Sequence, residues 1–144
     1  MDKSESSEPV LFFTECLSSE FQQLLIERKF DAFLKRILVD QPTFRTRKVA
    51  LDSVGLAMIR NPSFEFSEVN TLIKIVNQVL NLDSTDNTLR LNRLLVPGLE
   101  KILKSWVSER MDDVSSFIQD LLADENLSSI GTILNVAIIK VNKI

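Results

Sequence analysis

The apolar residues of this chain recur mostly at intervals of three and four, the spacing that places side chains on one face of an α-helix. The pattern is clearest over residues 30–38 and 69–80. Three glycines and four prolines in 144 residues are few for an all-β or loop-rich chain. The sequence therefore predicts an all-α fold of about six to seven helices, arranged as a bundle or as a short armadillo-like or HEAT-like stack.

The length of the chain suits a single domain. Residues 1–8 are polar and acidic and are predicted to be a flexible tail before one helical domain over residues 9–144. The apolar stripe changes phase near residues 27–30, which predicts a bend or a short break there. Pro42 disfavours helical geometry at the residue before it, so a helix should end at that point. Thr43 can then cap the next helix.

The middle of the chain is predicted to hold a buried helix, a loop and two amphipathic helices. The buried helix should end at Asn61 and Pro62, and Gly55 within it should permit the close approach of a neighbouring helix. Another helix follows up to Leu80, with Ser67 as its expected cap. The stretch "NLDSTDNT" is the clearest loop signal in the chain. Its candidate capping residues are Ser84, Thr85 and Asp86.

Pro97 and Gly98 interrupt "LNRLLVPGLEKILKSW", which otherwise reads as one apolar helix face. The apolar register from Leu91 to Trp106 continues across Pro97, which favours a single bent helix. Proline removes one backbone hydrogen bond and costs about 3 kcal/mol or more inside a helix, so burial of the continuous face must offset that cost. The alternative is a break in which Pro97 opens a new helix. The pattern leaves both a kink and a break open.

The last third is predicted to contain two further helices. Asp112 or Asp113 in "MDD" offers a cap that starts the first of them. The final segment, residues 126–144, fits a helical stripe, but its β-branched run "TILNVAII" is equally compatible with a buried strand. Helix and strand both remain open for this segment.

The side chains that most often carry catalysis are missing from this chain. It has no histidine and no tyrosine, so the usual general base and the commonest zinc ligand are absent. Cys16 lies in the apolar stretch "FFTECL" and is predicted to be a small core residue rather than a nucleophile. The acids of "MDDVSSFIQDLLADE" fall opposite the apolar face, which predicts a solvated surface rather than a metal site. We therefore expect no enzyme activity, no cofactor and no small-molecule substrate.

Charge is distributed unevenly along the chain, although its net value is only −3. Residues 1–27 carry a net charge of −5, residues 28–60 carry +5, and the rest carries −3. The basic segment could contact phosphates while its aromatic residue stacks on a base. The favoured interpretation is a solvated face that pairs with the protein's own acids. The candidate nucleic-acid contacts are Lys35, Arg36, Phe44, Arg45, Arg47 and Lys48.

A surplus of apolar side chains suggests a surface for a partner. Nine phenylalanines occur, and some of them, such as Phe64 and Phe66, lie outside the best helix stripes. Trp106 is the only tryptophan and is a candidate anchor, because tryptophan often dominates binding interfaces. The stretch "LNRLL" has the L-x-x-L-L spacing of coactivator helices that dock into apolar grooves, although any amphipathic helix produces such spacing. It supplies Leu91, Leu94 and Leu95 as further candidates.

Two functional classes fit these observations. The first is a non-enzymatic helical adaptor or scaffold that uses an apolar strip or groove to bind another protein, such as a helical peptide segment of it, or to form a homo-oligomer. The second is RNA or DNA binding through residues 28–48, against which the acidic pI near 5.0 argues. The polar start of the chain, the single cysteine and the lack of an apolar run of about 18 residues predict a cytoplasmic or nuclear protein without a membrane span.

Overall fold

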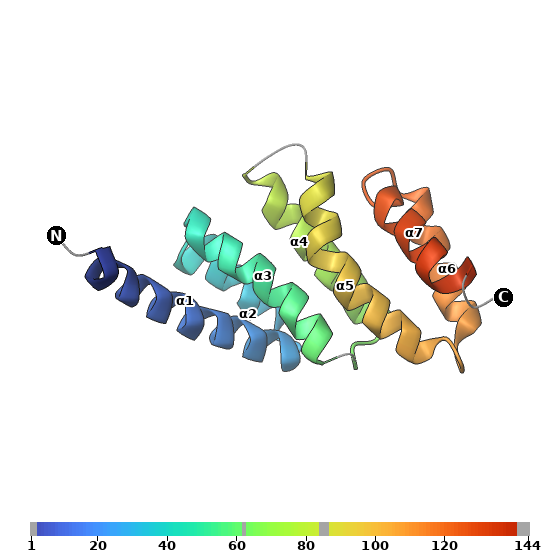
Figure 1. The fold of residues 1–144 in the computed structure, drawn as a ribbon, viewed down its shortest axis with the longest axis horizontal. Helices are drawn as coiled ribbons and strands as arrows, with labels where there is room; N and C mark the ends of the chain where they lie inside the picture. The colour runs from blue at the N-terminus through green and yellow to red at the C-terminus, as the bar shows by residue number, and fades with distance from the viewer. Residues whose placement is uncertain (1–2, 62, 84–86, 141–144) are drawn as a thin grey trace. The chain divides into compact units, whose positions relative to one another are not determined.

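The computed structural model describes the backbone of residues 3–61, 63–83 and 87–140, and their side chains from residue 15 to residue 139. Helices joined by turns make up these ranges, and no strand occurs within them (Figure 1). The all-α prediction is therefore confirmed. Contacts divide the chain into two compact units, Met1–Val54 and Gly55–Ile144, each of which is described by itself. The single domain expected over residues 9–144 stays a prediction.

The first unit contains two long helices, with a shorter helical segment between them in the sequence. The break predicted near residues 27–30 is confirmed, because turn residues 27–29 separate the first two helices. The segment after the break changes to a π-helix before it ends at Asp40. The elements are α1 (Lys3–Ile26), α2 (Phe30–Lys35), the π-helix η1 (Arg36–Asp40) and the part of α3 (Phe44–Arg60) up to Val54.

The start of α1 differs from the sequence prediction. This helix begins at Lys3, so the backbone of residues 3–8 is helical where a flexible tail was expected. The acidic composition that suggested a tail is therefore compatible with a helical backbone.

The core of the first unit forms where α1 meets α2. The ring of Phe21 contacts that of Phe33 edge to face, with ring centroids 5.2 Å apart, and both side chains are fully buried. Leu25 and Ile37 are buried as well. α1 also reaches α3, because the hydroxyls of Ser18 and Ser53 are hydrogen-bonded at 3.2 Å. The apolar helix stripes predicted from the sequence therefore supply the side chains of this core.

The start of α3 follows the prediction. The backbone N–H of Thr46 donates to the hydroxyl of Thr43 at 3.1 Å, so Thr43 caps this helix as expected. The helix ends at Arg60, one residue before Asn61. Pro62 lies outside the described residues.

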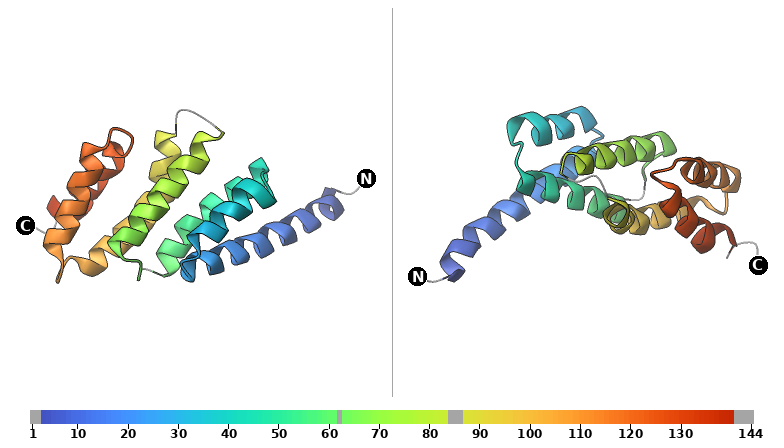
Figure 2. Two further views of the ribbon diagram at one scale, coloured as in Figure 1. Left: turned by 180° about the vertical axis from the view of Figure 1, so that it is seen from behind. Right: turned by 90° about the horizontal axis from the view of Figure 1, so that it is seen from above.

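The second unit consists of two helical hairpins and the last turns of α3, and its helices lie in two layers. Figure 2, seen from above, shows α4 beside α6 in one layer of this unit and α5 beside α7 in the other. The two layers pack against each other through apolar faces that hold most of the core of this unit. The elements are α4 (Phe66–Asn81), α5 (Thr88–Trp106), α6 (Met111–Ala123), α7 (Ser128–Leu134) and the π-helix η2 (Asn135–Lys140).

Two helix starts in this unit differ from those expected. Glu65, not Ser67, caps α4, and it forms a reciprocal capping box with Glu68, whose carboxylate accepts the backbone N–H of Glu65 at 2.8 Å. α6 begins at Met111, so Asp112 and Asp113 lie in its first turn and do not act as the cap. Their negative charges there interact favourably with the helix dipole. The expected caps at residues 84–86 lie outside the described residues.

α5 runs without a break from Thr88 to Trp106, with Pro97 inside it. The alternative in which Pro97 opens a new helix is therefore wrong, while a bend at Pro97 stays a prediction. Continuity is favoured because Leu95 and Leu99, on either side of Pro97, are both fully buried. Burial of one face along the whole helix offsets the hydrogen bond that proline cannot donate.

Two glycines bring α3 and α5 together within the second unit. A Cβ atom on Gly55 would lie 2.9 Å from the carbonyl oxygen of Leu94, so only glycine permits this approach. A Cβ atom on Gly98 would lie 2.6 Å from the Cβ of Met58. The close approach predicted at Gly55 is therefore confirmed, and Gly98 makes a second one.

The C-terminal segment is helical as far as the structure describes it. α7 continues directly into η2, which ends at Lys140. This settles the choice between helix and strand in favour of helix for residues 128–140, while residues 141–144 lie outside the described part. The buried side chains Ile130, Leu134 and Ile138 recur at intervals of four, which is the spacing of a helix and not the alternation of a strand.

Candidate functional site

Three of the side chains proposed as partner contacts lie in the core of the second unit. Phe64, Leu91 and Leu95 are 0%, 3% and 0% exposed, so they pack inside the unit and do not form a binding surface. The four-residue spacing of Leu91 and Leu95 is that of the buried face of a helix, which explains why these two residues also matched a docking motif. Leu94 is half-buried, and its carbonyl oxygen faces Gly55.

The other two proposed contacts, Phe66 and Trp106, meet in a half-exposed cluster. Their rings pack edge to face with centroids 4.3 Å apart, and Phe117 of α6 lies 5.3 Å from Phe66. The guanidinium of Arg110 lies 4.0 Å from the centroid of Trp106 and 5.2 Å from that of Phe66. Such stacking is the geometry of a cation–π interaction. We call Phe66, Trp106, Arg110 and Phe117 the aromatic–arginine cluster.

Arg110 is held in the cluster by two carboxylates. Its Nε donates to Asp113 at 3.0 Å, and its NH1 nitrogen lies 3.3 Å from a carboxylate oxygen of Glu65. The pKa of Arg110 is raised, first by the hydrogen bond to Asp113 and further by the hydrogen bond to Glu65, while desolvation opposes the shift. The cation therefore connects the start of α4 with the start of α6.

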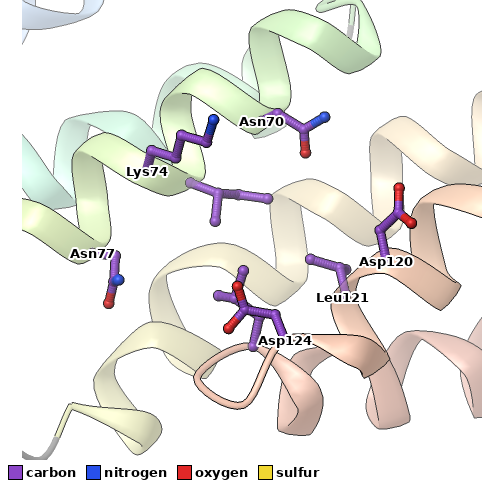
Figure 3. A pocket seen from close by; sticks show the side chains of 8 residues that line it. Asn70, Lys74, Asn77, Asp120, Leu121 and Asp124 are labelled. Carbon is purple, nitrogen blue, oxygen red and sulfur yellow. The ribbon is translucent and has the colours of Figure 1, made fainter.

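A groove runs between α4 and α6, and Figure 3 shows it from close by. It encloses about 200 Å³. Its apolar residues are Ile73, Leu121 and Leu127, of which the first two are buried. Polar side chains of both helices line the rest. We define the α4–α6 groove by its lining residues, Asn70, Ile73, Lys74, Asn77, Asp120, Leu121, Asp124 and Leu127.

The two walls of the α4–α6 groove differ in charge. Lys74 belongs to the α4 wall, whereas the α6 wall carries Asp120 and, at the C-cap of α6, Asp124 (Figure 3). Asp124 accepts the backbone N–H of Asn126 at 2.8 Å through one of its oxygens. Across the described part of the chain, no ion pair links Lys74 to either aspartate. These charges are consequently available to a bound segment.

The aromatic–arginine cluster lies at one end of this groove. Phe66 precedes Asn70 by one helical turn on α4, and Phe117 precedes Leu121 by one turn on α6. Because Phe66 contacts Phe117 across the two helices, the cluster closes that end. The groove thus has an apolar base and two polar walls, and the aromatic–arginine cluster lies one helical turn beyond its lining residues.

Sequence reasoning did not identify this groove. The acids of α6 were interpreted as a solvated face, which agrees with their exposure but not with their position beside α4. Asn70, Lys74 and Asn77 recur at intervals of four and three, so a polar stripe on α4 was visible in the sequence. The missing information was that α4 and α6 are neighbours although α5 separates them in the sequence.

The basic segment forms a separate hollow on α3 in the first unit. Phe44, Arg45 and Lys48 line it together with Val49 and Asp52, and it encloses about 500 Å³. Phe44 is 57% exposed at the start of the helix. An exposed ring beside two cations is the arrangement that stacking on a nucleic-acid base would need. We call these five residues the basic hollow.

The remaining basic candidates are not gathered in the basic hollow. Arg36 pairs with Glu20 at 3.1 Å, which is the internal pairing that was the alternative to phosphate binding. Arg47 donates to the backbone carbonyl of Pro42 at 3.1 Å. Lys35 is exposed on α2. The structure therefore brings together Phe44, Arg45 and Lys48 out of the six predicted residues.

Cys16 is exposed, so its predicted place in the core is wrong. The buried positions of α1 are Leu17, Phe21 and Leu25, which recur at intervals of four, and residue 16 falls beside that face. Within the described residues, no group of three or more histidine, cysteine, aspartate or glutamate side chains could hold a metal ion.

Hydropathy and comparison with known proteins give no further assignment. No helix in the described ranges has the length and apolar character that crossing a membrane requires. No known family matches the sequence, and neither the curated proteins nor the solved structures contain a significant match to it.

Proposed function

We propose that this chain is a non-catalytic interaction module that holds a segment of another protein in the α4–α6 groove. The observation that carries the proposal is the groove itself, with its apolar base, its polar walls and the half-exposed aromatic–arginine cluster at one end. Interface hot spots are rich in tryptophan and arginine, and both residue types occur in this cluster. The acids of the groove belong to a binding surface in this proposal, and no catalytic role is assigned to them.

The proposal places the partner on two adjacent features of the second unit. The half-buried rings of Phe66 and Trp106 can cover an apolar side chain of the partner. The amide and charged side chains of Asn70, Asn77 and Asp120 can hydrogen-bond the rest of its chain. A second copy of the protein could supply the segment as readily as a different protein, so self-association is one form of the same function.

A bulky residue placed in the groove tests the proposal. Tagged wild-type protein, Asn77→Trp and the control Lys101→Trp would be purified from the native cells, and bound proteins would be compared by quantitative mass spectrometry. Asn77 lines the groove, whereas Lys101 is exposed on α5 in the other layer of the unit. We expect that proteins recovered with the wild type and with Lys101→Trp are lost from Asn77→Trp. Equal recovery with both variants would overturn the proposal, provided that circular dichroism shows both to be folded.

Nucleic-acid binding is the second candidate function, and the basic hollow favours it. Phe44 is exposed beside Arg45 and Lys48, so a base could stack while the cations contact phosphates. Binding of labelled single-stranded and double-stranded RNA and DNA would be measured at several salt concentrations. The triple variant Arg45→Ala, Arg47→Ala, Lys48→Ala should lose binding and reduce its salt dependence. Absence of binding at low salt, or binding that the variant leaves unchanged, would exclude this function.

A further inference from the structure

We infer that the α4–α6 groove selects an extended segment with two basic residues separated by one residue, in which both basic side chains face α6. The inference rests on the proposed function, because it assumes that the groove holds a protein segment. It adds the conformation of that segment and the pattern of its charges.

The size of the groove indicates an extended chain. Its volume of about 200 Å³ is below the range of about 300–1,000 Å³ that pockets for whole small molecules occupy. An α-helix with its side chains is about 10–12 Å across, whereas an extended chain needs room for only one or two side chains at a time. A volume of this size therefore fits part of an extended segment that passes along the groove.

The α6 wall favours two cations at a defined spacing. Asp120 lies in the last turn of α6 and Asp124 is the C-cap residue four positions later, which corresponds to a rise of about 6 Å. Like charges at this spacing repel each other, so bound cations would relieve an unfavourable pair. In an extended chain, alternate side chains point the same way and repeat every 6.4–6.8 Å, by the usual rise of about 3.3 Å per residue. Lysine or arginine at alternate positions can therefore face the two aspartates.

The α4 wall favours an acceptor on the opposite side of the bound segment. The residue between the two basic ones points away from α6 and toward α4, where Lys74 lies. An acidic or hydrogen-bond-accepting side chain at this position would face the ammonium of Lys74, and a third basic residue there would be repelled. The opposite charges of the two walls thus favour an alternating basic, acidic, basic pattern.

The two asparagines can recognise the backbone of such a segment. Each amide offers both a donor and an acceptor, which are the two groups that a peptide unit presents. Asn70 and Asn77 are seven residues apart on α4, so their positions differ by about 10.5 Å along the helix. Three residues of extended chain cover about 10 Å. Both amides can therefore meet peptide groups of the same segment, three residues apart.

The test is a selection of random eight-residue peptides displayed on phage against the full chain. Enriched peptides would be synthesised with a fluorescent label, and their affinities would be measured by fluorescence anisotropy. Asp120→Asn/Asp124→Asn removes the two groove charges. Asp31→Asn/Asp40→Asn is the matched control, since it makes the same change in net charge at exposed positions of the first unit. Asn77→Trp reports whether a peptide binds in the groove.

The inference predicts peptides with basic residues at alternate positions. Their affinity should fall by about 2- to 30-fold in Asp120→Asn/Asp124→Asn, the range expected for two solvent-exposed ion pairs, and should not change in the control. Two results would overturn the inference and leave the proposed function standing. In the first, peptides that fail to bind Asn77→Trp are neutral or acidic. In the second, such peptides bind Asp120→Asn/Asp124→Asn as tightly as they bind the wild type. If no peptide depends on the groove, both are overturned.

Discussion

The guanidinium of Arg110 lies 4.0 Å from the ring centroid of Trp106, so the only tryptophan of the chain is stacked under a cation. The same cation bonds Asp113 and is paired with Glu65, and its ring contacts extend to Phe66. One residue in the turn between α5 and α6 thus links the starts of α4 and α6 to the end of α5. This linkage lies beyond one end of the α4–α6 groove.

Replacement of Arg110 should change the environment of Trp106. In Arg110→Gln the stacked cation and both ion pairs are lost, so more water should reach the indole and its fluorescence emission should shift to longer wavelength. Arg93→Gln removes an exposed cation elsewhere on α5 and serves as the control. Since Trp106 is the only tryptophan, the emission spectrum reports this cluster directly. An unchanged spectrum in Arg110→Gln would contradict the stacking.

A methyl group at residue 98 should destabilise the second unit. A Cβ atom there would lie 2.6 Å from the Cβ of Met58, and such overpacking costs about 1–3 kcal/mol. The higher helix propensity of alanine relative to glycine offsets about 1 kcal/mol of this cost. Gly98→Ala should therefore lower the free energy of unfolding by up to about 2 kcal/mol, measured by urea denaturation.

The double variant Gly98→Ala/Met58→Gly provides the control for that contact. It removes the Cβ that the new methyl group would meet, so its loss of stability should be smaller than the sum of the two single losses. A Gly98→Ala protein that is more stable than wild type would mean that helix propensity alone decides the outcome, and that α3 and α5 are not in close contact at this point.

Pro97 should be replaceable with a gain in stability. Because α5 is continuous around Pro97, alanine at this exposed position can donate the hydrogen bond that proline cannot. Pro97→Ala should raise the free energy of unfolding by about 1–3 kcal/mol. Pro42→Ala, at an exposed position before α3, should bring no such gain. A loss of stability in Pro97→Ala would indicate that proline fixes a helix start here.

The turn between α1 and α2 contains a left-handed residue that should prefer glycine. Arg28 has a φ angle of 59°, a conformation that costs a residue with a side chain about 1–2 kcal/mol. Arg28→Gly removes this cost, although glycine also raises the entropy of the unfolded chain. Lys29→Gly, at a φ angle of −87°, relieves no left-handed strain and brings the entropic loss together with the loss of an exposed ion pair to Glu27 at 3.7 Å. We expect Arg28→Gly to be more stable than Lys29→Gly by about 1–2 kcal/mol in thermal or urea denaturation, and the reverse order would contradict the left-handed turn.

Local signals in the sequence were sufficient to predict the helices and several of their ends. Pro42 and Thr43 marked the start of α3 because proline and a capping hydroxyl act within a few residues of themselves. The continuity of α5 through Pro97 was not determined in the same way, because it depends on burial on both sides of the proline. Glu65 was missed as the cap of α4 because Ser67 is the more usual residue type for that position.

The candidate site could be predicted only in part. Phe66 and Trp106 were identified as surplus aromatic residues, but their contact with each other and with Arg110 joins residues up to 44 positions apart. Phe64 was assigned to the surface because it lies outside a helix stripe, yet it is fully buried before the start of α4. Side chains from non-consecutive helices become neighbours only through the stacking of helical hairpins, which periodicity along the chain does not encode.

The most direct measurement of the central claim is site-specific photo-cross-linking in the native cell. The photoreactive residue p-benzoylphenylalanine would replace Asn77 in the α4–α6 groove or, as the control, Lys101 on the exposed side of α5. We predict that irradiation yields one defined protein adduct from position 77 and none from position 101. The absence of an adduct from position 77, or the formation of the same adducts from both positions, would contradict the proposal that this groove holds a partner segment.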